Sequence, residues 1–107
     1  MAKGMAGMMK QAQKLQARLA KVQEELASRE VEGTSGGGMV VARANGQQHI
    51  VGIRIDPEVV DADDVEMLED LIMAAIQQAR EKAQEMADRE VQRATSGMLP
   101  PGVNLGL

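Results

Sequence analysis

The sequence contains no phenylalanine, tyrosine, tryptophan or cysteine. Its core must therefore be built from Val, Ile, Leu, Met and Ala. Stacking of unpaired bases on aromatic rings is not available, which argues against most modes of single-strand nucleic-acid binding. The lack of cysteine excludes disulfides, thiolate metal sites and cysteine nucleophiles, and it fits a reducing compartment.

Long apolar runs are also missing. The longest is LIMAAI, residues 71–76, which is too short to cross a membrane, and the first residues lack the apolar run of a signal peptide. We therefore expect a cytoplasmic protein with no membrane partner. The 107 residues suffice for one small domain, which we place at residues 1–96, followed by a flexible tail at 97–107.

Acidic residues are absent from the first 23 positions, although the chain as a whole has a net charge of −4. This segment has a charge of +5, while the other 84 residues hold seven cations and sixteen acids, a charge of −9. Such asymmetry is typical of a local electrostatic footprint on an acidic body. The five cations are Lys3, Lys10, Lys14, Arg18 and Lys21.

A heptad pattern runs through the same segment and predicts a helix over about residues 5–28 that packs along its whole length. The cations occupy an arc of roughly 100° away from the apolar positions. This arc is consistent with a solvated face, with phosphate binding or with docking on an acidic protein surface. The apolar positions, which we call the seam, are Met5, Met8, Ala12, Leu15, Leu19, Val22 and Leu26.

The centre of the chain is prone to form strands, over residues 29–32, 39–44 and 49–55. The pair Asn45-Gly46 predicts a two-residue type I′ turn, which would place Val40 opposite Val51. The glycine-rich residues 33–39 are interpreted as a mobile loop between strands, because they lack the Lys-Ser/Thr of a P-loop. A second helical pattern runs from about Asp63 to Thr95. The predicted order is α-β-β-β-α.

The predicted helices are about 36 Å and 48 Å long, whereas a compact chain of this size has a radius of gyration of about 13 Å. Both helices must therefore overhang a small three-stranded sheet. A second copy of the chain is the simplest cover for their apolar seams, so we expect a homodimer.

Catalytic chemistry is not indicated by any constellation of residues. The acids of residues 61–66 are interpreted as a helix start rather than a cation loop, and His49 has no obvious triad partner. We therefore expect no catalytic residues, no metal site, no cofactor and no enzymatic activity.

Five stretches, taken in order, resemble the YbaB/EbfC nucleoid-associated proteins of bacteria. They are MMKQAQKLQ, VEGTSGGGMVVARANG, VGIRIDPEVV, EMLEDLIMAAIQQA and TSGMLPPG. The resemblance implies an α+β subunit with a three-stranded antiparallel sheet and two long helices, paired into a tweezer-like homodimer. It also implies binding to double-stranded DNA, association with the nucleoid, and a role in chromosome organisation or gene regulation.

In that family the protruding helices are thought to carry the DNA-contacting cations. Carried over to this chain, they are Lys10, Lys14, Arg18 and Lys21 of the first helix, with Lys3 ahead of them. The second helix offers Arg80, Lys82, Arg89 and Arg93, which acids at 81, 85, 88 and 90 dilute. The alternative function is a dimeric adaptor that docks on replication or recombination proteins and binds DNA only weakly.

Overall fold

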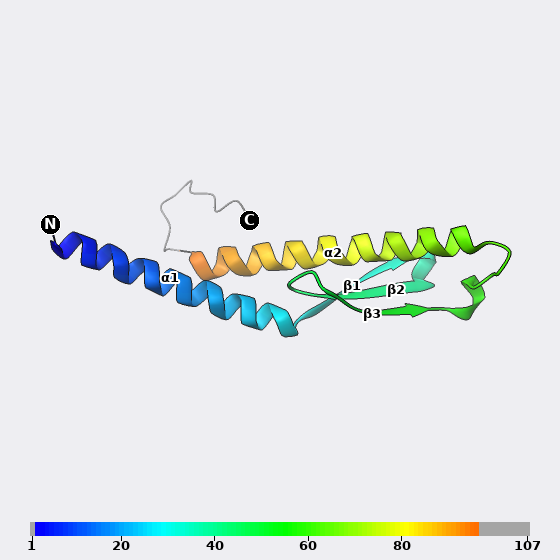
Figure 1. Cartoon of the computed structure of the whole chain (residues 1–107), viewed down its shortest axis with the longest axis horizontal. Coiled ribbons are helices and arrows are strands. Elements are labelled where there is room, and N and C mark those ends of the chain that lie inside the picture. Colours follow the sequence, from blue (N-terminus) through cyan, green and yellow to red (C-terminus); the bar gives the residue numbers. More distant parts are fainter. Residues whose placement is uncertain (1, 97–107) are drawn as a thin grey trace.

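The computed structural model describes residues 2–96, with side chains from residue 4 onward (Figure 1). The predicted order α-β-β-β-α is confirmed. The three strands form an antiparallel sheet in the order β1-β2-β3. The predicted tail, residues 97–107, lies outside the described residues. The elements are α1 (Ala2–Ser28), β1 (Glu30–Ser35), the 3₁₀ turn η1 (Gly36–Gly38), β2 (Val40–Asn45), β3 (Ile50–Ile55), the 3₁₀ turn η2 (Pro57–Val59) and α2 (Val65–Thr95).

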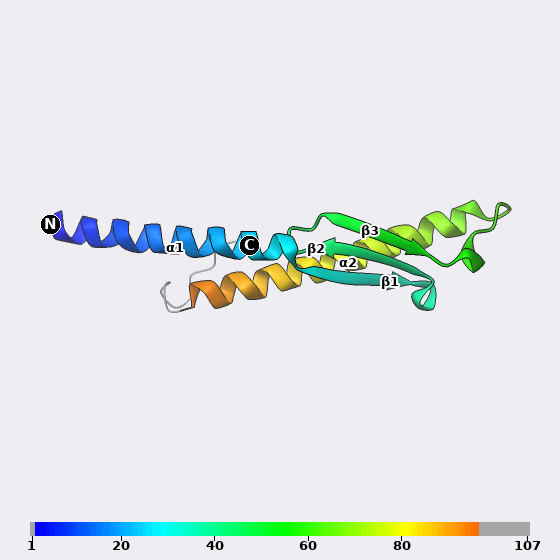
Figure 2. The same ribbon diagram turned by 90° about the horizontal axis from the view of Figure 1, so that it is seen from below.

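The molecule is a rod of 73 × 25 × 16 Å, in which both helices extend beyond the sheet, as predicted (Figures 1 and 2). The first half of α2 covers one face of the sheet, and its second half runs antiparallel to α1. From there α1 continues past the end of α2 to the far tip of the rod. Among the described residues, no helix is both long enough and apolar enough to cross a bilayer.

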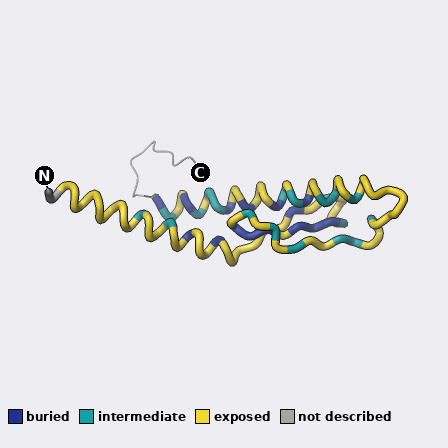
Figure 3. The backbone as a smooth tube through the Cα atoms, in the orientation of Figure 1, coloured by how far each residue is buried: buried dark blue, intermediate teal, exposed yellow. Residues whose placement is uncertain are grey.

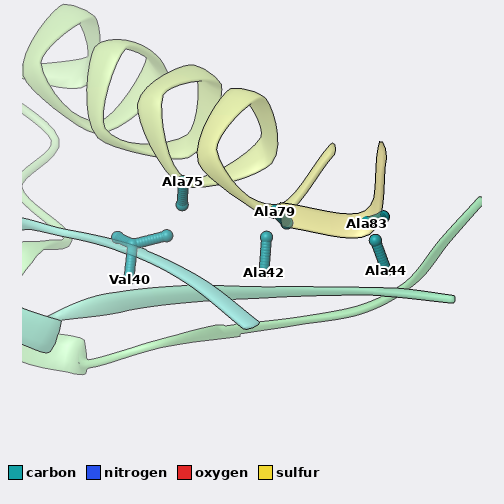
Figure 4. Close-up of a cluster of buried hydrophobic side chains, with 6 residues drawn as sticks. All are labelled: Val40, Ala42, Ala44, Ala75, Ala79 and Ala83. Carbon is teal, nitrogen blue, oxygen red and sulfur yellow. The ribbon is translucent and has the colours of Figure 1, made fainter. Parts of the chain in front are cut away.

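The contact between α2 and the sheet is made by small side chains (Figure 4). Because alanine carries one methyl group, the backbone of the helix lies close to the strands. At Gly33 of β1 the approach is so close that a Cβ atom would overlap the backbone of Ala75 and Ala79. The cluster comprises Val40, Ala42 and Ala44 of β2 with Ala75, Ala79 and Ala83 of α2, all fully buried.

This close approach also corrects the predicted end of the first strand. Residues 33–35 continue β1 instead of opening a loop, since Gly33 packs under α2 and Ser35 Oγ donates to the carbonyl oxygen of Leu71 at 2.5 Å. The glycines that follow form the 3₁₀ turn η1, in which Gly36, Gly37 and Gly38 all have positive φ. Only part of the glycine-rich segment is therefore a connection between strands.

The seam of α1 is packed over its second half only (Figure 3). Val22 and Leu26 are buried against Met86 and Val91 of α2, while Leu19 is half-buried at the margin. Nearer the N-terminus the exposed fraction rises to 73% at Met8. The predicted packing along the whole helix is thus not achieved within one chain, and cover of the first half by a second copy stays a prediction.

The predicted turn and register of the β2–β3 hairpin are wrong. Val40 pairs with Ile55 rather than with Val51, and the ladder contains a bulge between Arg43 and Ala44. The turn is closed by Gln48 N–H, which donates to the carbonyl oxygen of Asn45 at 2.9 Å, and positive φ falls on Gln48. A type I′ turn centred on Asn45 and Gly46 is therefore not formed.

Tertiary contacts explain this different turn. The Asn45 side chain accepts hydrogen bonds from the backbone N–H groups of Gln47 (2.9 Å) and His49 (3.0 Å). A Cβ atom at Gly46 would lie 2.7 Å from atoms of Leu26, the last buried residue of α1. The glycine thus permits close contact between hairpin and helix instead of supplying positive φ.

Candidate nucleic-acid interface

The free end of α1 forms an arm, which we define as residues 4–17, that stands clear of α2. Residues 4–14 are all exposed, and no acid occurs among them. The first polar contact with α2 comes at Arg18, whose Nη1 donates to the carbonyl oxygen of Ala94 at 3.4 Å. That carbonyl lies in the last turn of α2, where unpaired carbonyl groups carry partial negative charge. Arg18 therefore ties the base of the arm to the end of α2.

The predicted cations of α1 form one row. Counting 100° per residue, Lys10, Lys14, Arg18 and Lys21 fall within an arc of about 80°, roughly 110° from the buried side of the helix. The row extends about 16 Å along the helix axis from Lys10 to Lys21. All four residues are exposed. Lys3 belongs to α1, but its side chain is outside what the structure describes.

The predicted cations of α2 divide into two groups. Lys82, Arg89 and Arg93 fall within an arc of about 40° and form a second row, whereas Arg80 is turned about 160° away from Lys82. Arg80 also lies on the part of α2 that covers the sheet. The structure therefore separates Arg80 from the other predicted residues.

The two rows lie on the same side of the helix pair. In each helix the row is about 110° from the middle of the buried side, which is the midpoint between Val22 and Leu26 in α1 and between Met86 and Val91 in α2. Viewed from the N-terminus of its own helix, each row is offset from the buried side in the same rotational sense. Because the helices are antiparallel and their buried sides face each other, both rows end up on the same side of the pair. We call the seven residues the basic surface: Lys10, Lys14, Arg18, Lys21, Lys82, Arg89 and Arg93.

The acids that dilute the second row are arranged around it. Glu81, Glu85 and Asp88 lie about 60–120° from the centre of the row, on the side away from α1. Glu90 points toward the helix pair, where Arg29 binds its carboxylate at 3.1 Å and Arg93 at 3.6 Å. Arg29 was not predicted as a site residue, because its role depends on a carboxylate 61 positions away.

The other candidate residues have local structural roles. Asp64 caps α2, accepting from the backbone N–H of Met67 at 3.2 Å, and Asp61 accepts from Asp63 N–H at 2.9 Å. The interpretation of residues 61–66 as a helix start is therefore confirmed. Within residues 4–96, no group of three or more His, Cys, Asp or Glu side chains is placed to hold a metal ion.

Comparison with known proteins decides the family. The model of the YbaB/EbfC DNA-binding family matches residues 1–98. The chain belongs to the YbaB/EbfC DNA-binding family. The two helices that carry the basic surface lie within the matched residues, so the YbaB/EbfC match includes the arm as well as the sheet.

Named relatives agree with the YbaB/EbfC assignment. The nucleoid-associated protein of Caldanaerobacter subterraneus subsp. tengcongensis is 55% identical over 96 residues, which cover 90% of this chain and 86% of the relative. The nucleoid-associated protein of Pelotomaculum thermopropionicum is 50% identical over 99 residues, 92% of this chain and 94% of the relative. The crystal structure of an uncharacterized protein from Helicobacter pylori has the same fold, with a TM-score of 0.66 and 21% identity over 79% of this chain and 86% of that one.

Proposed function

We propose that the protein binds double-stranded DNA through the basic surface, mainly by contacts to phosphates. The observation that carries the proposal is the arm, an exposed helix end free of acid, with Lys10 and Lys14 one turn apart on one side. The row of α1 is about 16 Å long, which corresponds to about five base-pair steps of 3.4 Å. Lysine and arginine side chains in such a row release counterions from the duplex when they bind.

The proposed role is architectural and non-enzymatic, in keeping with relatives that are named nucleoid-associated proteins. We place the protein at the nucleoid, where it contributes to chromosome organisation and gene regulation. Neither helix of the arm region has the helix-turn-helix setting of a recognition helix. Binding is therefore only weakly sequence-selective, and any preference arises from the shape of the DNA.

The proposal includes a homodimer that leaves both arms free. Because α2 packs mainly on β1 and β2, the side of β3 that faces α2 stays partly open, and Ile53 is 44% exposed. Three further apolar residues are exposed near this opening. They are Val60, which precedes α2 (58%), and Val65 and Met73 of α2 (52% and 55%). We call Ile53, Val60, Val65 and Met73 the sheet-end patch. A second copy that covers this patch would bury these side chains and present two arms to one duplex.

Charge reversal on the arm tests DNA binding. In the arm variant, Lys10→Glu/Lys14→Glu, the affinity for a random duplex measured by fluorescence anisotropy should fall sharply. A dimer would lose four phosphate contacts, so the slope of log K against log salt should become less steep by about 3.6. The matched control is Arg54→Glu/Arg80→Glu, which makes the same charge change at exposed positions outside the basic surface.

The control should retain most of the affinity, and Lys82→Glu/Arg89→Glu should give an intermediate loss. Equal losses in the arm variant and the control would indicate that net charge, not the basic surface, governs binding. An arm variant that binds DNA with unchanged affinity and salt slope would reduce the row to a solvated face. The adaptor function, with docking on replication or recombination proteins, would then be favoured.

A further inference from the structure

The end of the molecule opposite the arm carries an acidic groove. This acidic groove is open, has a volume of about 510 Å³ and runs along the first turns of α2. Met67, Leu71 and Ala74 supply its apolar side chains, while Asp64, Glu66 and Asp70 supply carboxylates. The groove lies on the β1 side of α2, as the hydrogen bond from Ser35 Oγ to the carbonyl oxygen of Leu71 shows. Met73 of the sheet-end patch borders the groove, since it lies three residues after Asp70 on α2, but it is not one of the lining residues.

No cation balances the charge of this region along the chain. Residues 55–79 contain eight acids and no Lys, Arg or His. The three carboxylates of the groove take part in no described ion pair. An apolar groove flanked by carboxylates without ion-pair partners favours a partner that combines apolar side chains with cations.

The arm has the complementary composition. Met5, Met8 and Met9 are 68%, 73% and 61% exposed. Counting 100° per residue, Lys10 lies about 100° beyond Met9 at one edge of this methionine side, and Lys14 about 120° beyond Met8 at the other. Methionine side chains are flexible and adapt to irregular apolar surfaces. The arm therefore combines unpacked methionines with lysines beyond either edge of the methionine side, which suits an apolar floor with carboxylates beside it.

These two surfaces cannot meet within one chain. They lie at opposite ends of a rod 73 Å long, and α2 is a continuous helix between them (Figures 1 and 2). We propose that the arm of one copy docks in the acidic groove of another copy. Because different surfaces of the two copies meet, the contact is heterologous and can repeat from copy to copy.

The contact competes with DNA for the arm, and this consequence rests on the proposed DNA binding. The carboxylates of the groove would form ion pairs with the lysines that otherwise neutralise phosphates. Protein without DNA therefore associates end to end, and DNA releases the arms. Both interactions are electrostatic and weaken as salt rises.

Sedimentation velocity tests the contact without DNA. Wild-type protein should form species larger than a dimer at about 0.01 M salt and lose them at about 1 M salt, where the screening length is ~3 Å. In the groove variant, Glu66→Lys/Asp70→Lys, the association constant should fall by at least about tenfold, because lysines would face lysines. A chain that carries these changes together with Lys10→Glu/Lys14→Glu should regain association, because the charges of both contacting surfaces are then reversed.

The matched control is Glu81→Lys/Glu85→Lys, with the same spacing, charge change and exposure on the same helix. Equal losses in this control, or no rescue by the reversed pair, would overturn the proposal. The groove variant leaves the basic surface intact, so its DNA affinity should be equal to or higher than that of the wild type. A protein that fails to bind DNA but still associates through the groove would refute only the proposed function.

Crosslinking locates the contact, since the chain has no cysteine of its own. A mixture of Met8→Cys and Met67→Cys chains should form a mixed crosslink with a short bis-maleimide at low salt. Val51→Cys is the control for the groove, because it replaces a residue of β3 that is 44% exposed and does not line the groove. Equal rates with Met67→Cys and Val51→Cys would refute docking in the groove.

Discussion

The backbone N–H of Gly46 donates a 2.8 Å hydrogen bond to the carbonyl oxygen of Leu26, joining the β2–β3 turn to the last turn of α1. Two side chains strengthen this joint, since Asn45 Nδ2 donates to Ala27 O (3.4 Å) and Gln47 Nε2 donates to Gln23 O (3.1 Å). The hairpin thus supplies three additional donors to carbonyl oxygens in the last turns of α1. The joint fixes the direction in which the arm leaves the sheet.

A side chain at Gly46 should therefore weaken the fold. Gly46→Ala places a Cβ atom 2.7 Å from the Leu26 side chain and carbonyl oxygen, and we expect a loss of about 1–3 kcal/mol in the free energy of unfolding. Urea unfolding followed by far-UV circular dichroism measures the change. Gly7→Ala is the control, because nothing lies within 4 Å of its Cβ, and it should stabilise by up to about 1 kcal/mol through helix propensity. Equal effects at the two positions would argue against the joint.

The strand glycine under α2 should be still less tolerant. In Gly33→Ala the new methyl group overlaps the backbone of Ala75 and Ala79, and backbone cannot move aside as a flexible side chain can. We expect a loss of about 3 kcal/mol or more, at the upper end for overpacked cores. Thermal unfolding would show it. A melting temperature like that of the wild type would mean that α2 lies farther from β1 than the overlap at Gly33 implies.

Truncating the seam should have unequal effects along α1. Leu26 is 1% exposed, so Leu26→Ala should cost about 2–5 kcal/mol, whereas Leu15→Ala should cost less because Leu15 is only half-buried within the chain. Unfolding at several protein concentrations provides the measurement. If Leu15→Ala proves equally costly and its effect depends on protein concentration, a second copy covers the seam as well.

The salt dependence of DNA binding should report the number of phosphate contacts. If Lys10, Lys14 and Arg18 of both copies reach phosphates, six contacts give a slope of roughly −5 for log K against log salt. Titrations of one duplex at several salt concentrations measure it. A slope near zero would rule out phosphate contacts as the source of affinity.

Selectivity among duplexes should be low. With phosphate contacts dominant, the ratio of specific to random binding should stay below about 10⁴, a value well within the range of site-specific binders. Competition between random duplexes and sequences of contrasting minor-groove width would measure both the ratio and any preference for shape. A ratio above this value would require base-reading side chains that the basic surface does not explain.

Periodicity in the sequence located the helices and most of the basic surface, because both follow from the 3.6-residue repeat of a single helix. It also identified Val22 and Leu26 as core residues. The turn after β2 could not be predicted in the same way. Asn45-Gly46 favours a type I′ turn locally, but contact with Leu26, distant in the sequence, selects another turn and shifts the register.

The acidic groove illustrates the same limit. Its carboxylates are visible in the sequence as helix-start acids, but the exposed apolar floor depends on where α2 crosses the sheet. Arg80 is different, since counting 100° per residue from Lys82 separates the two without a structure. Whether any of the predicted cations contacts DNA stays a prediction.

The anchoring of α1 by its last turns alone has an evolutionary consequence. Residues 4–14 are exposed and contribute no side chain to either buried cluster, so substitutions there leave the folded core almost untouched. Selection can then add, remove or shift lysines on the arm with little loss of folding free energy. The affinity for a polyanion can therefore change from species to species while the stability of the domain stays nearly the same.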